Sequence, residues 1–594
     1  MSHSPTRELI YQILASFSLG MGAWYIGWRW WASLNWEAAW FSLPLLAAET
    51  LAWLGSALFF LSIWINRDPE QKPAPATLND ILPEPRDEDR PLVVDVMFPT
   101  YNEDPELVRL SVRDAKAITY PHPVDIRIHV LDDGRRPEVA EMARAEGVNY
   151  IARSTNEGYK AGNLRNAMER TSGDVIVICD ADTRPFPQLL ERTLGHFRDP
   201  EVAWVQTPQW FYDLDEGAPL PEFLARSLRL GRAGRALGRA VEAVTGPVRL
   251  GRDPFGNDPE MFYDIIQRRR NWCNASFCCG AGSLHRREAV METSLKSWSQ
   301  SVEDAVAPLL GDVEETSERD ALAPIIFAEA MRSVEFTPYK FHVSEDIYTS
   351  IVQHSDPNRA WRSVYHPEVL SKMLSPQDLL TWTTQRFKYA GGTLDIFWND
   401  NPLRLKHLGG WQKWMYASTI YSYLAPLWTV AFLLAPLIYL FTGIAPVSAY
   451  GDAFYLHLVP FLIANRLAFM VGTWGVDTWR GEQYYLSFFW VNLKAMRDVL
   501  MGRPIKFTVT PKTRASGNFL PLAAPHLAFI GLTLIGFAWQ GWRVHQGLGD
   551  PAAYLVNVFW GMSNILSLSV MVFAAIRLPD ASEQPGADAL KAAA

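Results

Sequence analysis

Long apolar runs at both ends of the chain enclose a large polar region. Six runs are long enough to cross the hydrocarbon core of a bilayer as a helix, and they cover residues 9–28, 38–65, 415–443, 454–474, 521–542 and 552–576. Three of them carry titratable side chains, among them Glu49 and His526. We expect these to face protein or a polar pore, because an ionisable group in lipid is costly. The pattern therefore predicts six membrane-spanning helices, two before and four after the polar region.

Short apolar runs alternate with helical stretches inside the polar region. The runs at 92–98, 126–131 and 175–178 have the length of strands, and the last is unbroken and β-branched, as expected of a strand buried on both faces. A helical stretch at 106–118 separates the first two runs. This order predicts a right-handed parallel α/β sheet. The segment 67–90, rich in Pro, Glu and Asp, predicts a loosely ordered linker.

Length, charge and cysteine content narrow the class of protein. A chain of 594 residues is too long for a single core, and the excess lies mostly in the apolar runs. The net charge of -9 gives no support to nucleic-acid binding. The basic residues that flank the runs place the polar region and both termini in the cytoplasm. The four cysteines are therefore expected to be reduced thiols, and their spacing makes no zinc site.

Two carboxylates follow the run at 175–178. Asp180 and Asp182 are one residue apart, at the edge of the predicted sheet where a metal-bound phosphate would lie. Their hard oxygen atoms suit Mg²⁺ or Mn²⁺. An acidic turn without a ligand is the alternative interpretation of an isolated Asp-x-Asp, so the metal site depends on the motifs around it.

Eight short motifs carry a resemblance to a known family. The four that resemble the inverting family 2 glycosyltransferases of GT-A fold are PTYNE at 99–103, DDG at 132–134, KAGN at 160–163 and DAD at 180–182. The four that resemble its processive branch are FCCG at 277–280, SED at 344–346, QRFKY at 385–389 and FTVTPK at 507–512. Among processive enzymes, the chain is most similar to the catalytic subunit of bacterial cellulose synthase, over residues 36–577.

The resemblance implies a fold, a donor and a set of site residues. The fold is a cytoplasmic GT-A domain, an α/β Rossmann-like fold, inserted in a polytopic bundle of transmembrane helices. The donor is UDP-glucose, with Mg²⁺ or Mn²⁺ held by Asp180 and Asp182. By resemblance, UDP is bound by Thr100, Tyr101, Glu103, Asp132, Asp133, Lys160, Gln385, Arg386, Lys388, Phe507, Val509 and Thr510. The acceptor is bound by Cys279, Gly280, Gln385 and Tyr389.

Asp346 occupies the position of the family's general base, with Glu345 beside it. In the family this carboxylate accepts the proton of the acceptor hydroxyl while that oxygen attacks C1 of the donor, which inverts the anomer. The alternative is structural: Ser344 would cap a helix, and the two acids would lie in its first turn, where they favour the helix dipole. Both roles can hold at once, because a cap would fix the position of the carboxylate.

Two residues depart from the cellulose synthases, which have Arg and Trp where this chain has Lys388 and Tyr389. Lys keeps the charge but loses the bidentate fork, and Tyr offers a smaller stacking face to the terminal sugar. The residues after 577 are also too few for the PilZ domain that binds cyclic di-GMP, so we expect another form of regulation. On these grounds we prefer a curdlan-type β-1,3 or mixed-linkage product, with cellulose as the alternative.

The predicted domain boundaries follow the apolar runs. They are two spans at 1–66, the linker at 67–90, the catalytic domain at 91–374, interfacial helices at 375–412, two spans at 413–475, an interfacial helix and gating loop at 476–520, two spans at 521–577 and a tail at 578–594. The catalytic domain holds a basic insertion at 218–252 and an acidic one at 293–333. Arginines among leucines at helical spacing predict that the basic insertion is either a helix on the anionic inner leaflet or a solvated helix.

The sequence thus predicts a processive β-glucan synthase of the bacterial inner membrane that threads its product through its own spans. Its expected partners are UDP-glucose, the growing glucan chain and membrane lipids, with periplasmic export subunits as further candidates and no nucleic acid. One alternative is a non-processive transferase to a lipid phosphate, which would not need residues 385–389. Another is a transporter or scaffold with a degenerate nucleotide fold. The intact acidic residues of the motifs argue against the second.

Overall fold

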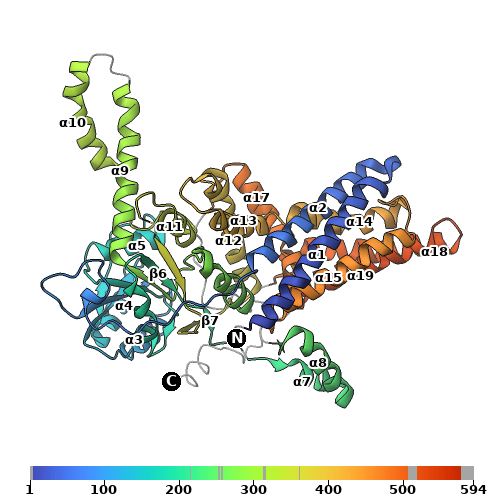
Figure 1. Cartoon of the computed structure of the whole chain (residues 1–594), viewed down its shortest axis with the longest axis horizontal. Helices are drawn as coiled ribbons and strands as arrows, with labels where there is room; N and C mark the ends of the chain where they lie inside the picture. Colours follow the sequence, from blue (N-terminus) through green and yellow to red (C-terminus); the bar gives the residue numbers. More distant parts are fainter. Residues whose placement is uncertain are drawn as a thin grey trace.

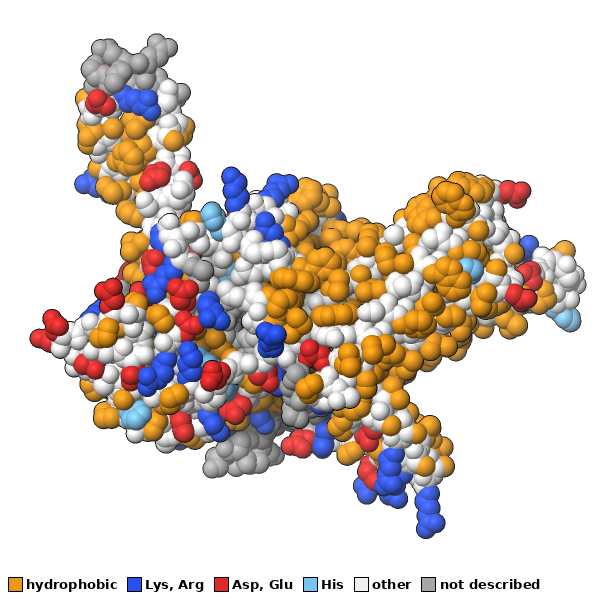
Figure 2. Space-filling view, viewed as in Figure 1, with side chains coloured by type: hydrophobic (Ala, Val, Ile, Leu, Met, Phe, Trp, Pro, Cys, Tyr) orange, Lys and Arg blue, Asp and Glu red, His pale blue; other side chains and the backbone are white. Residues whose placement is uncertain are grey.

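The computed structural model describes residues 4–214, 216–251, 255, 259–311, 316–359, 361–505 and 518–576. These residues form a globular α/β part and a bundle of long helices, from which two helical hairpins project (Figure 1). Hydrophobic side chains cover much of the bundle on the face shown in Figure 2, whereas charged side chains of both signs cover the globular part. The two parts therefore present surfaces suited to lipid and to water.

A mixed seven-stranded sheet organises the globular part. Its order is β11-β6-β10-β4-β1-β2-β3. The strands are β1 (Leu92–Thr100), β2 (Val124–Asp132), β3 (Asn149–Ile151), β4 (Val175–Ile178), β6 (Val202–Gln206), β10 (Ser283–Arg286) and β11 (Arg362–Tyr365). The three predicted strands, β1, β2 and β4, are confirmed and pair in parallel. β10, which was not predicted from the sequence, runs antiparallel to both β4 and β6, so the complete sheet is mixed.

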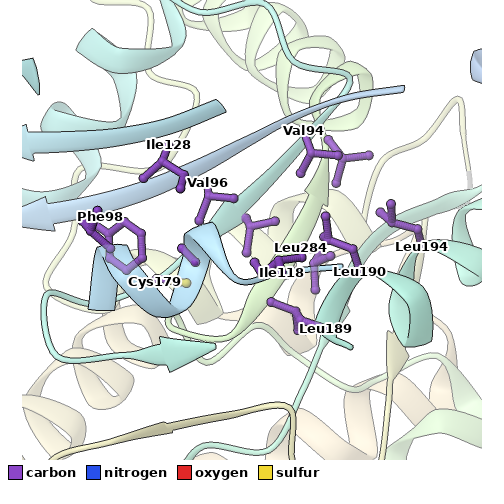
Figure 3. Packing of buried hydrophobic residues seen from close by; sticks show 14 of the residues in the cluster. Val94, Val96, Phe98, Ile118, Ile128, Cys179, Leu189, Leu190, Leu194 and Leu284 are labelled. Carbon is purple, nitrogen blue, oxygen red and sulfur yellow. The ribbon is translucent and has the colours of Figure 1, made fainter. Parts of the chain in front are cut away.

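Alternate residues of β4 pack on opposite faces of the sheet. Val175 and Val177 belong to one apolar cluster, and Ile176 and Ile178 to another. Figure 3 shows part of the first cluster, where side chains of β1 pack against side chains of the neighbouring helices and strands. The helices on that face are α3 (Pro105–Lys116), α4 (Pro137–Glu146) and α6 (Leu189–Thr193), and α5 (Tyr159–Met168) covers the other face. Burial on both faces thus accounts for the unbroken apolar run.

The prediction of a loosely ordered linker at 67–90 is wrong. A short 3-10 helix, Leu78–Asp80, forms there. Leu78 and Ile81 join the core of the sheet and are 4% and 3% exposed. Arg198 donates a hydrogen bond to Asp80 across 2.9 Å. Two buried apolar side chains therefore fix this segment, a signal too short to show as a periodic pattern.

Within the described residues, six helical segments are long and apolar enough to cross a membrane, as predicted. They are α1 (Pro5–Ala32), α2 (Ala39–Ser62), α13 with α14 (Gly410–Tyr423 and Pro426–Thr442), α15 (Asp452–Gly472), α18 (Ala524–His545) and α19 (Pro551–Ile576). Glu49 pairs with Arg29 across 2.8 Å. The buried His526 ring bonds the Ser487 carbonyl across 2.7 Å. Both ionisable groups therefore face protein, as expected.

Each insertion forms a helical hairpin. The basic stretch contains α7 (Leu220–Arg226) and α8 (Gly231–Thr245), and a two-stranded sheet of β8 (Ala218–Pro219) and β9 (Arg249–Leu250) closes the base of this hairpin. The acidic stretch lies in α9 (Arg287–Gly311) and α10 (Thr316–Ser333), which project from the globular part on its far side from α7 and α8 (Figure 1).

Candidate active site

The motifs at 99–103, 132–134, 180–182 and 277–280 meet at one edge of the sheet because of the strand directions. Thr100 and Asp132 are register partners at the ends of β1 and β2. Asp180 follows the end of β4, which lies parallel beside β1. The antiparallel β10 begins where β4 ends, since Ser283 pairs with Ile178. The segment that precedes β10 therefore reaches the same edge, where ligands of α/β sheets bind.

Arg136 joins the first two motifs in what we call the arginine network, made of Thr100, Glu103, Asp132 and Arg136. The Asp132 carboxylate is fully buried and accepts hydrogen bonds from the Arg136 side chain, the closest at 3.1 Å. Arg136 also donates to the Thr100 hydroxyl at 2.9 Å and to the Glu103 carbonyl. Glu103 in turn accepts from the Thr100 hydroxyl and the Tyr101 amide, both at 2.7 Å. The network holds both loops in place without a ligand.

Asp133 makes a second arginine pair rather than pointing into open space. Arg153 donates to both of its carboxylate oxygens, at 2.6 and 2.8 Å. The same guanidinium donates to the carbonyls of Glu157 and Tyr159, just before Lys160. Asp133, predicted to bind UDP, thus fixes the start of α5 in this structure. Through that helix it positions Lys160.

Lys160 lies at the centre of a group that we call the lysine cluster, made of Lys160, Asp180, Gly280, Glu345 and Asp346. Its ammonium donates to Asp180 across 2.6 Å. Gly280 has a φ of 86°, and a β-carbon added there would lie 3.5 Å from the Lys160 ammonium and 3.7 Å from an Asp346 oxygen. Lysine, glycine and carboxylate thus meet at one point. The positive φ favours glycine at this position, while both distances are ordinary van der Waals contacts.

Burial changes the acidity of the lysine cluster. It raises the pKa of Glu345 to about 7, with a further increase from the Asp346 carboxylate and a decrease from Lys160. Burial also raises the pKa of Asp346, while the Ile347 amide and Lys160 act in the opposite direction. The Asp180, Glu345 and Asp346 carboxylates raise the pKa of Lys160 against the effect of its own burial. A carboxylate with a raised pKa is a better proton acceptor near neutral pH.

Asp346 lies in the first turn of α11 (Glu345–His354). Its Oδ1 accepts from the Ile347 amide at 2.8 Å, and its carbonyl accepts from the Ser350 hydroxyl at 2.8 Å. The Ser350 hydroxyl accepts from the Cys278 amide at 2.9 Å, which ties α11 to the FCCG segment. Ser344 is the N-cap residue, but its side chain caps no backbone amide. The predicted serine cap is therefore wrong, and the position of Asp346 is set by Ser350 and Cys278.

The residues of the QRFKY motif lie on α12 (Leu379–Asn399), which crosses α11 closely. A β-carbon added at Gly392 would overlap the Ser344 hydroxyl, so the two helices touch there. The Arg386 guanidinium lies over the rings of Trp382 and Phe488, each 5.9 Å away. Tyr389 is 43% exposed and so keeps an open ring face. Gln385 and Lys388 are partly buried on the same helix.

The floor of the site is continuous with the third span. Phe277 stacks on Tyr416 of α13 with ring centroids 6.4 Å apart. His354, at the end of α11, bonds the Tyr416 hydroxyl across 2.9 Å. Arg270 donates to the Met415 carbonyl at 3.1 Å and to the Thr419 hydroxyl at 2.6 Å. The helix that carries Asp346 is therefore fixed to the beginning of a membrane span.

The two carboxylates that follow β4, those of Asp180 and Asp182, are suitable ligands for a hard divalent cation. The Asp182 side chain is fully buried, and its Oδ2 accepts from the Leu374 amide at 3.2 Å. Asp180 is 37% exposed beside Lys160. Among the described residues, no group of three or more His, Cys, Asp or Glu side chains could hold a metal. Two carboxylates would leave the remaining positions of the cation to phosphate oxygens and water, as Mg²⁺ prefers.

The structure brings most predicted residues to one edge and adds two that the sequence interpretation missed. Phe507, Val509 and Thr510 lie outside the described residues. Cys279 donates its amide to Gln206 at 2.7 Å and accepts at its carbonyl from Gln209 at 2.7 Å, so its backbone is fixed. The missed residues are Arg136 and Arg153. A signal existed for the first, because a basic residue soon after an Asp-Asp-Gly turn can reach back to the carboxylates.

Comparison with known proteins confirms the resemblance predicted from the motifs. Residues 95–293 match the family model described as glycosyl transferase family 2. The chain is similar to Cellulose synthase 1 of Komagataeibacter xylinus, with 29% identity over 98% of this chain and 33% of the relative. It is also 27% identical to the cellulose synthase catalytic subunit [UDP-forming] of Pseudomonas fluorescens, over 94% of this chain and 66% of the relative. The chain thus spans about a third to two thirds of the length of these relatives.

Solved structures give a weaker likeness. A mannosyltransferase from Pyrobaculum calidifontis in complex with GDP-Man and Mn²⁺ aligns with 77% of this chain and 97% of its own. The sequence identity is 14% and the TM-score is 0.39. The α/β sheet with its family 2 match and the six apolar helices together confirm the predicted fold class.

Proposed function

We propose that this chain is an inverting, processive glycosyltransferase that polymerises glucose from UDP-glucose into a β-glucan and moves the product across the bacterial inner membrane. One observation carries the proposal: Lys160, Asp180 and Asp346 meet at the ligand-binding edge of the sheet, directly above a membrane span. The names of the cellulose synthase relatives support a UDP-sugar donor. A transferase to a lipid phosphate would not need this continuity between site and span.

Asp346 is the proposed general base. The terminal hydroxyl of the acceptor attacks C1 of the donor, the bond from C1 to the diphosphate breaks, and UDP leaves with the bonding pair. The hydroxyl proton passes to the Asp346 carboxylate, whose pKa is raised by burial. Lys160 is positioned to balance the negative charge of the leaving diphosphate. Tyr389, which is partly exposed on α12, is the proposed stacking platform for the terminal sugar.

Asp180 and Asp182 are the proposed ligands of a divalent cation, Mg²⁺ or Mn²⁺, which would neutralise the leaving diphosphate when bound. Lys160 donates to Asp180 Oδ1, so the Lys160 ammonium and a bound cation would share the Asp180 carboxylate. We therefore expect chelation to stop synthesis and Asp182→Ala to weaken UDP binding only while metal is present. Unchanged synthesis in excess chelator would show that lysine alone balances the diphosphate.

The experiment that tests the proposal is synthesis by the purified full chain in proteoliposomes supplied with UDP-glucose. UDP release should accompany a polymer that sediments with the vesicles. UDP-N-acetylglucosamine in place of UDP-glucose is the matched control and should give little polymer. Release of UDP into a lipid-linked sugar without polymer would favour the lipid-phosphate alternative, and no release of UDP would favour a transporter or scaffold.

The linkage of the product has two candidates with separate support. The relatives are named cellulose synthases, which favours β-1,4 glucan. Lys388 and Tyr389, which replace Arg and Trp of those enzymes, favour a differently oriented acceptor and so a β-1,3 or mixed glucan. Digestion of the polymer separately with an endo-β-1,3-glucanase and a cellulase decides between them. Complete digestion by the cellulase alone would make the two replacements neutral.

The proposed topology places the site and both termini in the cytoplasm. An even number of spans, six, supports it, because the chain then returns to the side on which it began. Tags at residues 1 and 594 should resist external protease in intact cells. Cleavage of one tag but not the other would require an odd number of spans.

A further inference from the structure

The basic hairpin of α7 and α8 is a rigid unit. Gly234 and Gly238 are buried where α8 crosses α7, and a β-carbon at Gly238 would lie 2.5 Å from the backbone of Pro221. Arg235 of α8 pairs with Glu222 of α7 across 3.0 Å. The β8 and β9 pair closes its base. The hairpin therefore presents its surface side chains in a fixed arrangement.

The base of the hairpin is attached to the bundle at the ends of the spans that face the globular part. The Thr245 carbonyl at the end of α8 accepts from the Gly475 amide at 2.6 Å. Val244 packs in a cluster with Tyr11 of α1 and Trp64, which follows α2. Figure 1 shows the hairpin beside the N-terminal end of α1, extending sideways from the bundle. A bilayer around the spans would therefore meet the hairpin at its surface.

Two kinds of side chain are exposed on this hairpin. Residues 220–246 contain five arginines and two glutamates, and Arg226, Arg229, Arg232 and Arg239 are exposed. Leu228, Leu230 and Leu237 are 54%, 46% and 54% exposed. Figure 2 shows hydrophobic side chains along one flank of the hairpin and basic side chains along the other. Three exposed leucines beside a basic cluster are not expected of a helix that faces only water, whereas an interfacial helix combines both features.

We propose that the α7–α8 hairpin docks on the anionic lipid surface that surrounds the domain-side ends of the spans. The leucines would enter the boundary between headgroups and acyl chains, and the arginines would contact lipid phosphates. The inference needs the six helices to span a membrane, but it does not need the proposed glycosyl transfer. It distinguishes between the two interpretations of residues 218–252, a helix on lipid and a solvated helix.

The charge sets the size of the expected effect. Each basic residue near an anionic surface favours binding by about fivefold. Arg232 and Arg239 have exposed side chains on α8 and make no ion pair among the described residues. Replacing both by glutamate should therefore lower the ratio of docked to undocked hairpin by at least roughly 25-fold. Raised salt should act in the same direction, because it screens exposed charges.

The test places an environment-sensitive fluorophore on the hairpin of the full chain. Ala233→Cys, one helical turn from Leu237, carries the label, and the unsubstituted protein gives the background from its own cysteines. The protein is placed in nanodiscs of phosphatidylcholine alone or mixed with phosphatidylglycerol. We expect the emission to shift to shorter wavelength, and to be quenched by lipid-attached quenchers, only in the anionic discs. Arg232→Glu with Arg239→Glu should abolish both changes.

A matched control reverses the same number of charges elsewhere. Arg319→Glu with Arg332→Glu lies on the exposed surface of α10, on the far hairpin, and should leave the emission unchanged. Arg232→Gln with Arg239→Gln gives a milder variant, and thermal unfolding of each variant checks that it is folded. Equal emission in both lipid mixtures would overturn the proposal. A shift on adding inorganic phosphate to phosphatidylcholine discs would also overturn it, because the arginines would then bind free phosphate. UDP release from the same discs reports independently on the proposed enzyme.

Discussion

The arginine network and the lysine cluster lie at the same edge of the sheet, but they handle negative charge in opposite ways. In the arginine network the buried Asp132 carboxylate is paired with the Arg136 guanidinium, and the neighbouring Asp133 is paired in the same way with Arg153. In the lysine cluster, Asp180, Glu345 and Asp346 all act on the ammonium of Lys160. Each of these two buried aspartates is therefore paired with an arginine. The lysine cluster holds excess negative charge, which suits an incoming cation and a group that must accept a proton.

The largest expected effect comes from removing the proposed proton acceptor, Asp346. Asp346→Asn should keep the fold and the affinity for UDP, because Oδ1 can still accept from the Ile347 amide. Its polymerisation rate should fall by about 10² to 10⁴, the usual contribution of a general base. The measurement is UDP release under saturating UDP-glucose, together with a UDP binding assay. Asp400→Asn, which changes an exposed carboxylate bonded to Tyr348 at 2.6 Å, is the matched control and should stay active.

Removing a balancing charge from the arginine network should act on stability instead. Arg136→Ala leaves the fully buried Asp132 without its guanidinium, a change that costs about 3 to 5 kcal/mol for a buried ion pair. Thermal unfolding should show the loss, and UDP binding should weaken with it. The double variant with Asp132→Asn should recover part of the stability, since no uncompensated charge remains. Full stability of Arg136→Ala alone would show that Asp132 is balanced by other groups.

The smallest expected effect is a dependence of stability and activity on pH. It distinguishes the lysine cluster from the arginine network most clearly. Burial and Asp346 raise the pKa of Glu345 to about 7. The folded protein therefore holds a proton there that the unfolded chain has lost, and the stabilisation disappears as pH rises through about 7. Activity should change in the opposite sense and rise with pH, because an ionised Asp346 is needed and burial raises the pKa of its carboxyl.

Glu345→Gln should move the midpoint of the activity profile toward lower pH, since it removes a neighbouring carboxylate that competes for the same proton. Rates measured between pH 5 and 8 under saturating donor give the profile of both proteins. Glu335→Gln, a change on an exposed carboxylate that pairs with Arg165, serves as the control and should leave the midpoint in place. An identical profile in Glu345→Gln would show that Asp346 titrates independently of Glu345.

Much of the fold could be predicted because strong local signals coincide with it. The β-branched run at β4 is buried on both faces, and the six apolar runs are helices of spanning length. β10 gave no such signal, because His285 and Arg286 make half of it. Arg286 is 2% exposed, and its guanidinium donates to the carbonyls of Ile81, Phe197 and Val202. Such long-range partners satisfy a buried charge but leave no trace in the local pattern.

The candidate site was predictable to the extent that its residues follow strand ends. Asp132 and Asp180 belong to this class, because the carboxyl edge of a sheet is a general ligand position. Arg153 does not, since the partner of an arginine depends on which loops the fold brings together, whereas Arg136 lies soon enough after Asp132 for its pairing to be predictable. The same limit applies to Ser344, where a cap was expected from residue type alone. The hydroxyl instead lies against Gly392, a contact set by the crossing of α11 and α12.

The attachment of α11 to the beginning of α13 links the orientation of the third span to that of the helix that carries Asp346. His354 and Arg270 contact the first turns of the third span, so we expect a tilt of that span to move the helix that carries Asp346. Spans tilt when the bilayer becomes thinner than their apolar length. We therefore expect a thinner bilayer to displace Asp346, the proposed general base. The thickness of the surrounding lipid would then be one of the factors that set the geometry of the site.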